Sequence, residues 1–373
     1  MNISADNLNR ICRQIQEDCT GCRQCMAACP FLQETGCSPG EIARRRPSVL
    51  EAYSCTLCGL CEALCPLGLS PNAMFLAARQ EAVRTGQIDI NEYRYLFPDR
   101  KSTVMSYYRQ FHGISYHHLP CDRVGPNALF PGCVLLTYAP PLIDGLYRHL
   151  QAKLGSLSLL TDCCGLPLAQ LGLADRAHRL HVALRHKLTG LQVENLYIAC
   201  PNCYYLLRQV LSATSIKLFT VYEGLDPAHL PGGGGQVVAI HDSCPDRHAG
   251  IFARQVRHAL IAKDYIIEEL PHHRRHRACC GSGGQVTHFR PDLAEELLTR
   301  HRQEFARHPA PTVAAYCLGC VLNFAKTSGE KKVQHVLNLL LGVEQDYTGI
   351  KAKAAALFAG PAGEAAWQEI MSD

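Results

Sequence analysis

Cysteine constrains this chain more than any other residue type. The 373-residue sequence contains 21 cysteines, and 18 of them fall in three blocks, Cys19–Cys65, Cys133–Cys203 and Cys244–Cys320, when the unmatched Cys12, Cys37 and Cys121 are set aside. Disulfide-stapled secreted domains are shorter and denser in cysteine than this chain. The N-terminus also lacks the charged-then-apolar pattern of a signal peptide. We therefore expect a cytoplasmic protein whose reduced thiols hold metal.

Composition excludes several other classes of protein. With 47% hydrophobic and 19% charged residues, the chain is ordinary globular material. The longest apolar stretch, 127–143, is interrupted by three prolines, so we expect no transmembrane segment, although docking on the inner face of a membrane stays open. The net charge of +4 is scattered along the chain, and we expect no nucleic-acid partner.

The first block consists of two four-cysteine runs, each closed by proline. The runs are Cys19-x-x-Cys22-x-x-Cys25-x-x-x-Cys29-Pro30 and Cys55-x-x-Cys58-x-x-Cys61-x-x-x-Cys65-Pro66. This is the run of two-cluster bacterial ferredoxins, in which the fourth cysteine of each run binds the other [4Fe–4S] cubane. Structural zinc instead uses two pairs of cysteines, which makes it the weaker alternative. The expected ligands are Cys19, Cys22, Cys25 and Cys65 for cluster 1, and Cys55, Cys58, Cys61 and Cys29 for cluster 2.

The second and third blocks are tandem copies of one unit. Each contains a single cysteine, an adjacent pair followed by glycine, and a Cys-x-x-Cys element, and matching cysteines are 111 to 117 residues apart. Such regular self-similarity indicates a duplicated structural unit. The copies comprise Cys133, Cys163, Cys164, Cys200 and Cys203, and then Cys244, Cys279, Cys280, Cys317 and Cys320.

Short apolar runs alternate with helical patterns in both copies. This alternation predicts an α/β fold, a parallel sheet with helices on its faces. Each cysteine element then lies beyond the carboxyl end of a strand, where open α/β sheets bind ligands. We expect helices at 175–188 and 291–305. The expected strands are 128–130, 157–160, 196–199 and 216–221 in the first copy, and 237–240, 265–267, 313–316 and 333–337 in the second.

Five thiols per copy exceed the four that tetrahedral zinc needs and the two of a redox dithiol. They suggest an iron–sulfur centre with unusual protein ligation. The duplicated pattern resembles the cysteine-rich CCG domain of the heterodisulfide reductase family. With the ferredoxin-like module in front, residues 10–340 resemble the catalytic subunit of that enzyme, and also the iron–sulfur subunits of glycolate oxidase and anaerobic glycerol-3-phosphate dehydrogenase.

The resemblance implies a noncubane [4Fe–4S] cluster in each copy, held by its five cysteines. The leading hypothesis is a catalytic oxidoreductase subunit that passes electrons through two cubanes to two noncubane clusters, which reduce a disulfide or similar acceptor. The alternatives are a relay between a flavin dehydrogenase and a quinone or cytochrome b, and a scaffold in a larger assembly. We find no flavin or nicotinamide fingerprint. We therefore expect a hetero-oligomeric complex with a flavin-containing donor subunit or a membrane cytochrome b.

The predicted boundaries follow the tyrosine-rich stretch after the first block and the glycine run 232–235. They give a mainly helical ferredoxin-like domain with its linker at 1–125, CCG domains at 126–234 and 235–345, and a helical tail at 346–373. The tail carries no chemical signature.

The remaining features have plain interpretations. We expect Cys12, Cys37 and Cys121 to be small buried or partly exposed thiols. The basic run 271–277 is expected to be a solvated loop or a cationic docking face, and the glycines at 281–284 to bring N–H groups close to cluster sulfur. His241, three residues before Cys244, is a candidate proton donor near the cluster.

Overall fold

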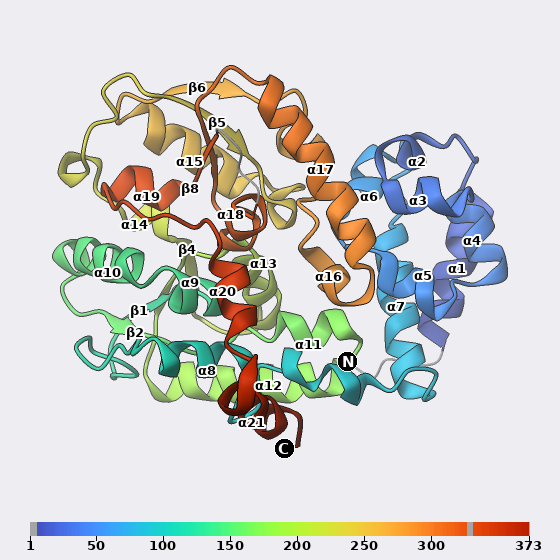
Figure 1. Ribbon diagram of the computed structural model, residues 1–373, viewed down its shortest axis with the longest axis horizontal. Helices are drawn as coiled ribbons and strands as arrows, with labels where there is room; N and C mark the ends of the chain where they lie inside the picture. The colour runs from blue at the N-terminus through green and yellow to red at the C-terminus, as the bar shows by residue number, and fades with distance from the viewer. Residues whose placement is uncertain (1–5, 327–330, 373) are drawn as a thin grey trace.

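A computed structural model describes residues 6–326 and 331–372, which form one helical module and two parallel sheets (Figure 1). The helical module lies at one side of the molecule, and the two sheets stand one above the other on the opposite side. Helices α16 and α17 of the second sheet lie between the sheets and the module, and α17 packs on α3. The predicted mixture of a helical domain and two α/β units is therefore confirmed.

The helical module is built from short helices with strong start signals. Ser38 and Ser48 each form a capping box with the glutamate three residues later, and proline occupies the first turn of α3, α4 and α7. These capping residues and prolines stabilise the ends of helices that are too short to be stable alone, so helices can form in the short segments between cysteines. The helices are α1 (Asp6–Asp18), α2 (Gln24–Ala28), α3 (Pro30–Thr35), α4 (Pro39–Arg45), α5 (Val49–Ser54), α6 (Leu60–Leu64) and α7 (Pro71–Arg84).

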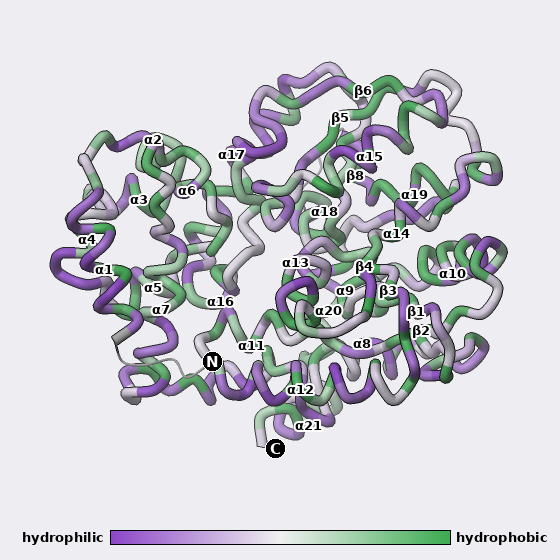
Figure 2. Tube along the Cα trace, turned by 180° about the vertical axis from the view of Figure 1, so that it is seen from behind, coloured by the Kyte–Doolittle hydropathy of each residue, from purple (hydrophilic) through white to green (hydrophobic). Residues whose placement is uncertain are grey.

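The first sheet has the strand order β2-β1-β3-β4, with every pair parallel. After an initial asparagine, the central strands β1 and β3 are buried and apolar, as is typical of helix-covered parallel strands. Figure 2 shows the hydropathy of the chain around them. The strands are β1 (Asn127–Phe130), β2 (Ser158–Leu159), β3 (Asn195–Ile198) and β4 (Lys217–Thr220). The helices are α9 (Cys133–Tyr138), α10 (Pro140–Leu154), α11 (Leu166–Leu171), α12 (Ala174–Gly190), α13 (Pro201–Val210), α14 (Val221–Gly224) and η2 (Pro227–His229).

The second sheet repeats this arrangement in the order β6-β5-β7-β8, again with every pair parallel. Its strands are β5 (Val237–His241), β6 (Ile266–Glu269), β7 (Thr312–Ala315) and β8 (Lys332–His335). Its helices are η3 (Cys244–Asp246), α15 (Ile251–Ile261), η4 (Arg274–His276), η5 (Gly283–Gln285), α16 (Val286–Phe289), α17 (Pro291–Arg307), α18 (Leu318–Phe324) and α19 (Val336–Leu341). The duplication predicted from the cysteines is a duplication of fold.

The last strand of each copy ends earlier than the apolar pattern predicts. The sequence predicts strand through Val221 and Leu337, but helices begin at Val221 and Val336. Thr220 and His335 each start a capping box at that point, so the backbone turns into a helix while the side chains stay apolar. Hydrophobicity alone cannot separate a buried strand from a buried helix.

A linker and a C-terminal tail complete the fold. The linker between module and first sheet contains η1 (Ile90–Leu96) and α8 (Val104–Phe111), and the tail contains α20 (Ile350–Ala356) and α21 (Gly360–Ser372). In Figure 1 the tail runs down the front of the molecule toward the linker, and α21 contacts η1. No helix within residues 6–326 and 331–372 has both the length and the apolar character needed to cross a bilayer.

The hydrophobic core joins the modules. One cluster of buried side chains runs through both sheets. A second fills the helical module but also takes Leu168 and Leu171 from the first copy, and Val286 and Leu293 from the second. The helical module is thus held against both copies by apolar contact.

Candidate metal centres

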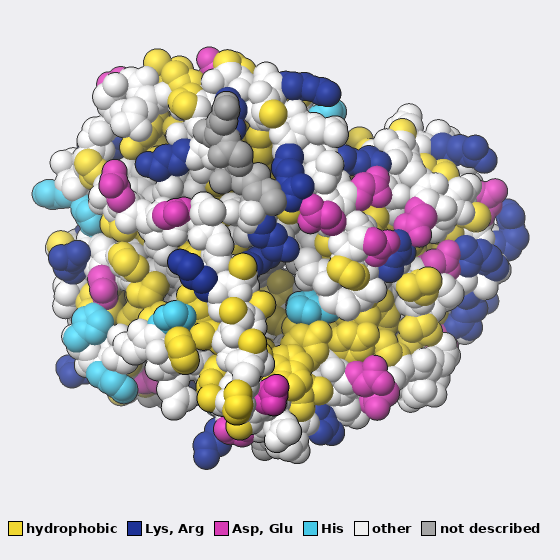
Figure 3. Space-filling model, viewed as in Figure 1, with side chains coloured by type: hydrophobic (Ala, Val, Ile, Leu, Met, Phe, Trp, Pro, Cys, Tyr) yellow, Lys and Arg dark blue, Asp and Glu magenta, His cyan; other side chains and the backbone are white. Residues whose placement is uncertain are grey.

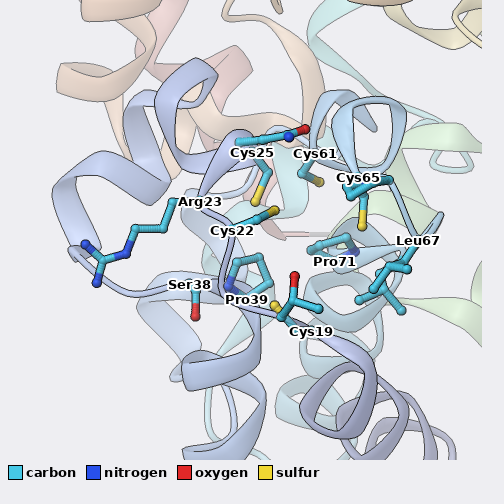
Figure 4. A pocket seen from close by; sticks show the side chains of 14 residues that line it. Cys19, Cys22, Arg23, Cys25, Ser38, Pro39, Cys61, Cys65, Leu67 and Pro71 are labelled. Carbon is cyan, nitrogen blue, oxygen red and sulfur yellow. The ribbon is translucent and has the colours of Figure 1, made fainter.

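The first predicted cluster site lies near the surface of the helical module. Cys19, Cys22, Cys25 and Cys65 line one pocket, and their sulfur atoms face a common space while Arg23 points away (Figure 4). Cys22 is exposed to solvent. The structure therefore brings together the four cysteines expected for cluster 1, at a position that a partner protein can approach.

The second predicted cluster site lies deeper in the molecule. Cys29, Cys55, Cys58 and Cys61 line an adjacent pocket whose other walls include Phe31. The second cysteine-rich copy closes this pocket with Cys279, Leu293 and Leu297. The four cysteines expected for cluster 2 are therefore enclosed between the helical module and the second copy.

Left-handed backbone turns bring each run of cysteines around its site. Gly21 and Arg23 have φ of 68° and 60°, and the matching Leu57 and Gly59 have φ of 54° and 70°. A positive φ is unfavourable for leucine and arginine. The same turn is nevertheless kept at all four positions, because it points the three closely spaced sulfur atoms of each run in one direction.

The chemistry of these side chains fits iron–sulfur clusters. Burial raises the pKa of Cys25 to about 11 and that of Cys55 to about 12, so both thiols would stay protonated at neutral pH without a bound cation. In the part of the chain that the structure describes, no three His, Cys, Asp or Glu side chains close around a single ion. Cysteine sulfur is the usual ligand of iron–sulfur clusters, so the donor sets of these two pockets fit such groups.

The ten cysteines of the duplicated copies form one continuous line of thiols. Asn202, between Cys200 and Cys203 of the first copy, donates to Cys317 Sγ of the second copy at 3.7 Å, and the neighbouring Cys200 thiol raises the pKa of Cys317. Cys320 Sγ lies 3.3 Å from Cys280 Sγ. Each thiol perturbs the pKa of the next one in the series Cys133, Cys163, Cys164, Cys203, Cys200, Cys317, Cys320, Cys280, Cys279 and Cys244. The two predicted five-cysteine sites are thus direct neighbours.

Sheet topology explains why these cysteines meet. Cys133 follows β1, and Cys200 follows β3, its neighbour in the sheet. The strand order begins like the doubly wound order 2-1-3-4-5, whose ligand crevice lies between the carboxyl ends of the first and third strands. In the second copy Cys244 follows β5 and Cys317 follows β7 in the same way.

The line of thiols continues into the helical module. Cys58 of the helical module and Cys279 of the second copy line the same pocket, and Cys279 raises the pKa of Cys58. Arg247 fixes this junction, because its Nε donates to the Cys58 carbonyl at 3.0 Å and its Nη2 donates to the Arg277 carbonyl at 2.6 Å. The junction therefore joins the cluster 2 site to the second five-cysteine site through packed protein.

Arg79 connects all three parts of the molecule. It is fully buried, and its guanidinium donates to the carbonyls of Ala52 and Cys55 in the helical module, Gln170 in the first copy and Gly284 in the second. Burial lowers the pKa of Arg79 only to about 10, so it stays charged at neutral pH. No sequence signal identifies this residue, because an arginine in an amphipathic helix is normally exposed.

The glycines after the second cysteine pair serve chiefly for close packing. A Cβ on Gly283 would lie 2.6 Å from the Thr56 carbonyl oxygen, and one on Gly284 would lie 2.7 Å from that of Cys55. One N–H does approach a thiol, since Gly281 N lies 3.5 Å from Cys279 Sγ. Gly281 thus places an N–H group near sulfur, as expected. Gly283 and Gly284 instead leave room for the backbone of the helical module at Thr56 and Cys55.

Replacement of Gly284 by alanine tests this packing. We expect the G284A variant to be destabilised by about 1–3 kcal/mol through overpacking against Cys55, as measured by thermal unfolding of the holoprotein. Gly234 provides a matched control, because it has the same φ of 59° but nothing within 4 Å of a Cβ. If G284A and G234A lose the same stability, the cost at Gly284 comes from backbone strain and not from the contact with Cys55.

A cavity of about 830 Å³ opens on the line of thiols at the first copy. Cys133 and Cys163 form part of its wall, and Ser282 and Gly319 of the second copy form another part. The linker and α12 close the sides, and the surface is hollowed beside the C-terminal helices (Figure 3). The volume is that of a small-molecule site.

His241 lies away from this cavity. It is buried, its ring centroid lies 5.3 Å from that of His301, and burial lowers its pKa well below the usual value. A neutral imidazole still carries one ring N–H, and the role of His241 as a proton donor near the cluster stays a prediction. The nearby Arg277 is fully buried and pairs with Glu304, although the run that contains it is otherwise largely exposed.

The cysteines outside the motifs lie where small thiols are expected. Cys12 is buried in the core of the helical module, and Cys37 and Cys121 are partly buried. Two residues that the sequence did not single out, Arg79 and Lys351, contact the junction or the cavity.

Comparison with known proteins agrees with this geometry. The 4Fe–4S dicluster domain family matches residues 15–69, and the cysteine-rich domain family matches residues 127–208 and again 238–325. The B subunit of the fumarate reductase (CoM/CoB) from Methanothermobacter marburgensis is 23% identical over 86% of this chain and 71% of its own length. The D subunit of the dihydromethanophenazine:CoB–CoM heterodisulfide reductase from Methanosarcina mazei is 22% identical over 94% of this chain and 98% of its own length. The same subunit from Methanosarcina barkeri is 23% identical over 87% of this chain and 92% of its own length.

Proposed function

We propose that this chain, which is similar to the D subunits of heterodisulfide reductases along most of its length, is an iron–sulfur oxidoreductase subunit that reduces a disulfide at the joined cysteine-rich copies. Cluster 1 would be held by Cys19, Cys22, Cys25 and Cys65, and cluster 2 by Cys55, Cys58, Cys61 and Cys29. The two five-cysteine sets would hold the noncubane clusters. When bound, these clusters supply one-electron transfer.

One observation supports this proposal above the others. A series of neighbouring thiols that perturb one another's pKa runs from Cys58, through Cys279 and Cys317, to Cys200 and on to Cys133. The exposed Cys22 stands at the outer end of the helical module, and the cavity lies at the other end of the line. The order of sites therefore suits electrons that enter at cluster 1 and leave at the cavity.

Reduction of a disulfide needs two electrons and two protons and gives two thiols. Two neighbouring five-cysteine sites, which meet at Cys200 and Cys317, suit such a reaction, because the cluster that each would hold could supply one electron. The chain's own residues shape the cavity, bind the substrate and keep the two sites adjacent. The electrons come from a partner protein, for which we propose a flavin-containing subunit or a membrane cytochrome b.

Iron analysis of anaerobically purified protein is the first test. We expect on the order of sixteen iron atoms per chain, four in each of four clusters. About eight iron atoms would mean that only the helical module carries clusters, and the catalytic proposal would be withdrawn.

Thiol binding separates catalysis from electron relay. We expect a thiol added to the oxidised holoprotein to change the paramagnetic signal of the cysteine-rich copies and to leave that of the reduced ferredoxin clusters unchanged. A protein with all its iron whose spectrum responds to no thiol would instead be a relay between a flavin dehydrogenase and a quinone or cytochrome.

A further inference from the structure

The C-terminal tail completes the cavity. Trp367 of α21 packs on Tyr95 with 5.0 Å between ring centroids, and Phe358 packs on Tyr107 at 5.3 Å. Arg94 Nη1 donates to the Met371 carbonyl at 3.2 Å. Since Tyr95 lines the cavity, these contacts fix the tail against the cavity wall and place Lys351 of α20 in its lining.

The cavity lining is electropositive. It contains six basic side chains, Arg100, Arg109, Arg176, Arg179, Lys187 and Lys351, but only two acidic ones, Asp99 and Asp162. Arg176 pairs with Asp99, and Lys187 pairs with Asp162 at 2.7 Å and with Asp122 at 2.8 Å. His288 adds no charge, because burial lowers its pKa to about 4. The excess of positive charge favours a ligand with an anionic group.

Lys351 differs from Arg176 and Lys187, two cations of this lining that pair with carboxylates. Its ammonium donates to Asn323 Oδ1 at 3.2 Å, and it forms no ion pair with any carboxylate in the part of the chain that the structure describes. Burial lowers its pKa to about 8, with a smaller contribution from Lys326, so most of the side chain is still protonated at neutral pH. A partly buried cation without an anion is costly unless a ligand supplies one.

Asn323 connects this lysine to the second cysteine-rich copy. Its Nδ2 donates to the Cys280 carbonyl at 2.6 Å while its Oδ1 accepts from Lys351. The ammonium is thereby held near one of the five-cysteine sites, on the same cavity as Cys133 and Cys163 of the other site. A ligand whose sulfur reaches the cysteine sites can therefore place an anionic group beside Lys351.

We propose that Lys351 is a substrate-positioning residue whose ammonium binds the anionic group of a small thiol or disulfide in this cavity. The inference rests on the proposed function for the thiol chemistry of the ligand. The preference for an anionic group rests on the charges of the lining.

Binding of two isosteric thiols, mercaptoacetate and its uncharged amide mercaptoacetamide, tests this role by equilibrium dialysis against the anaerobic holoprotein. We expect K351Q to weaken mercaptoacetate binding about tenfold or more, the effect of one lost charge-assisted hydrogen bond, and to leave the amide unaffected. K351R should retain most of the affinity because it keeps the charge. K353Q is the matched control, since Lys353 is exposed on the same helix.

Three outcomes would overturn the proposal. The first is that wild-type protein binds the two thiols with equal affinity. The second is that K351Q weakens the binding of both thiols alike, and the third is that K353Q loses as much mercaptoacetate affinity as K351Q. Each of these results would deny Lys351 a specific anion-binding role. Reduction of the disulfide of mercaptoacetate by wild-type protein whose clusters have first been reduced chemically tests the proposed function separately. Failure of that reaction with preserved anion selectivity would refute disulfide reduction while leaving the role of Lys351 in binding standing.

Discussion

Replacement of Arg79 by alanine is expected to separate the helical module from the cysteine-rich copies. The substitution leaves four buried carbonyls, those of Ala52, Cys55, Gln170 and Gly284, without their donor. Unsatisfied buried acceptors cost about 1–3 kcal/mol each, and partial relaxation should leave a loss of about 4 kcal/mol or more. Thermal unfolding and limited proteolysis of the linker at 85–126 would both report the change.

Electron transfer should show the same effect. We expect R79A to slow reduction of the cysteine-rich copies by pre-reduced ferredoxin clusters, because the contact between Cys58 and Cys279 lies beside the Arg79 junction. R84A is the control, since Arg84 is exposed at the end of the same helix and should change stability by less than about 0.5 kcal/mol. An R79A variant with wild-type stability and wild-type transfer would remove Arg79 from the electron path.

Loss of the adjacent cysteine pair in the first copy is expected to abolish disulfide reduction. Cys163 and Cys164 occupy the middle of the first five-cysteine site, and Cys163 also faces the cavity. The double variant C163S/C164S should lose about four of sixteen iron atoms, since the remaining thiols cannot replace two adjacent ligands. Iron analysis and the rate of disulfide reduction check this together.

The remaining clusters provide the internal control. The spectrum of the reduced ferredoxin clusters should be unchanged in C163S/C164S, because their cysteines lie in the helical module. C121S, which changes a partly buried thiol outside the motif in the same copy, should keep all its iron. Disulfide reduction that survives the double variant would assign catalysis to the second copy alone.

The local pattern of hydrophobic residues was enough to predict the positions of most strands and of the long helices. Buried parallel strands are near-continuous apolar runs, so the positions of β1, β3, β5 and β7 follow from hydrophobicity. Helices α12 and α17 lie within a few residues of their predicted limits. The pattern failed at Val221 and Val336, where a capping residue changes the backbone without changing the hydrophobicity.

The sequence by itself determined which thiols belong together, because cysteine spacing is a local property and its repetition shows the duplication. Only the tertiary structure decided the order of the sites, since the contacts of Cys58 with Cys279 and of Cys200 with Cys317 join residues more than 100 positions apart. It also decided the roles of Arg79 and Lys351. The physical reason is that burial changes what an arginine or a lysine can do, and burial depends on segments that are distant in the chain.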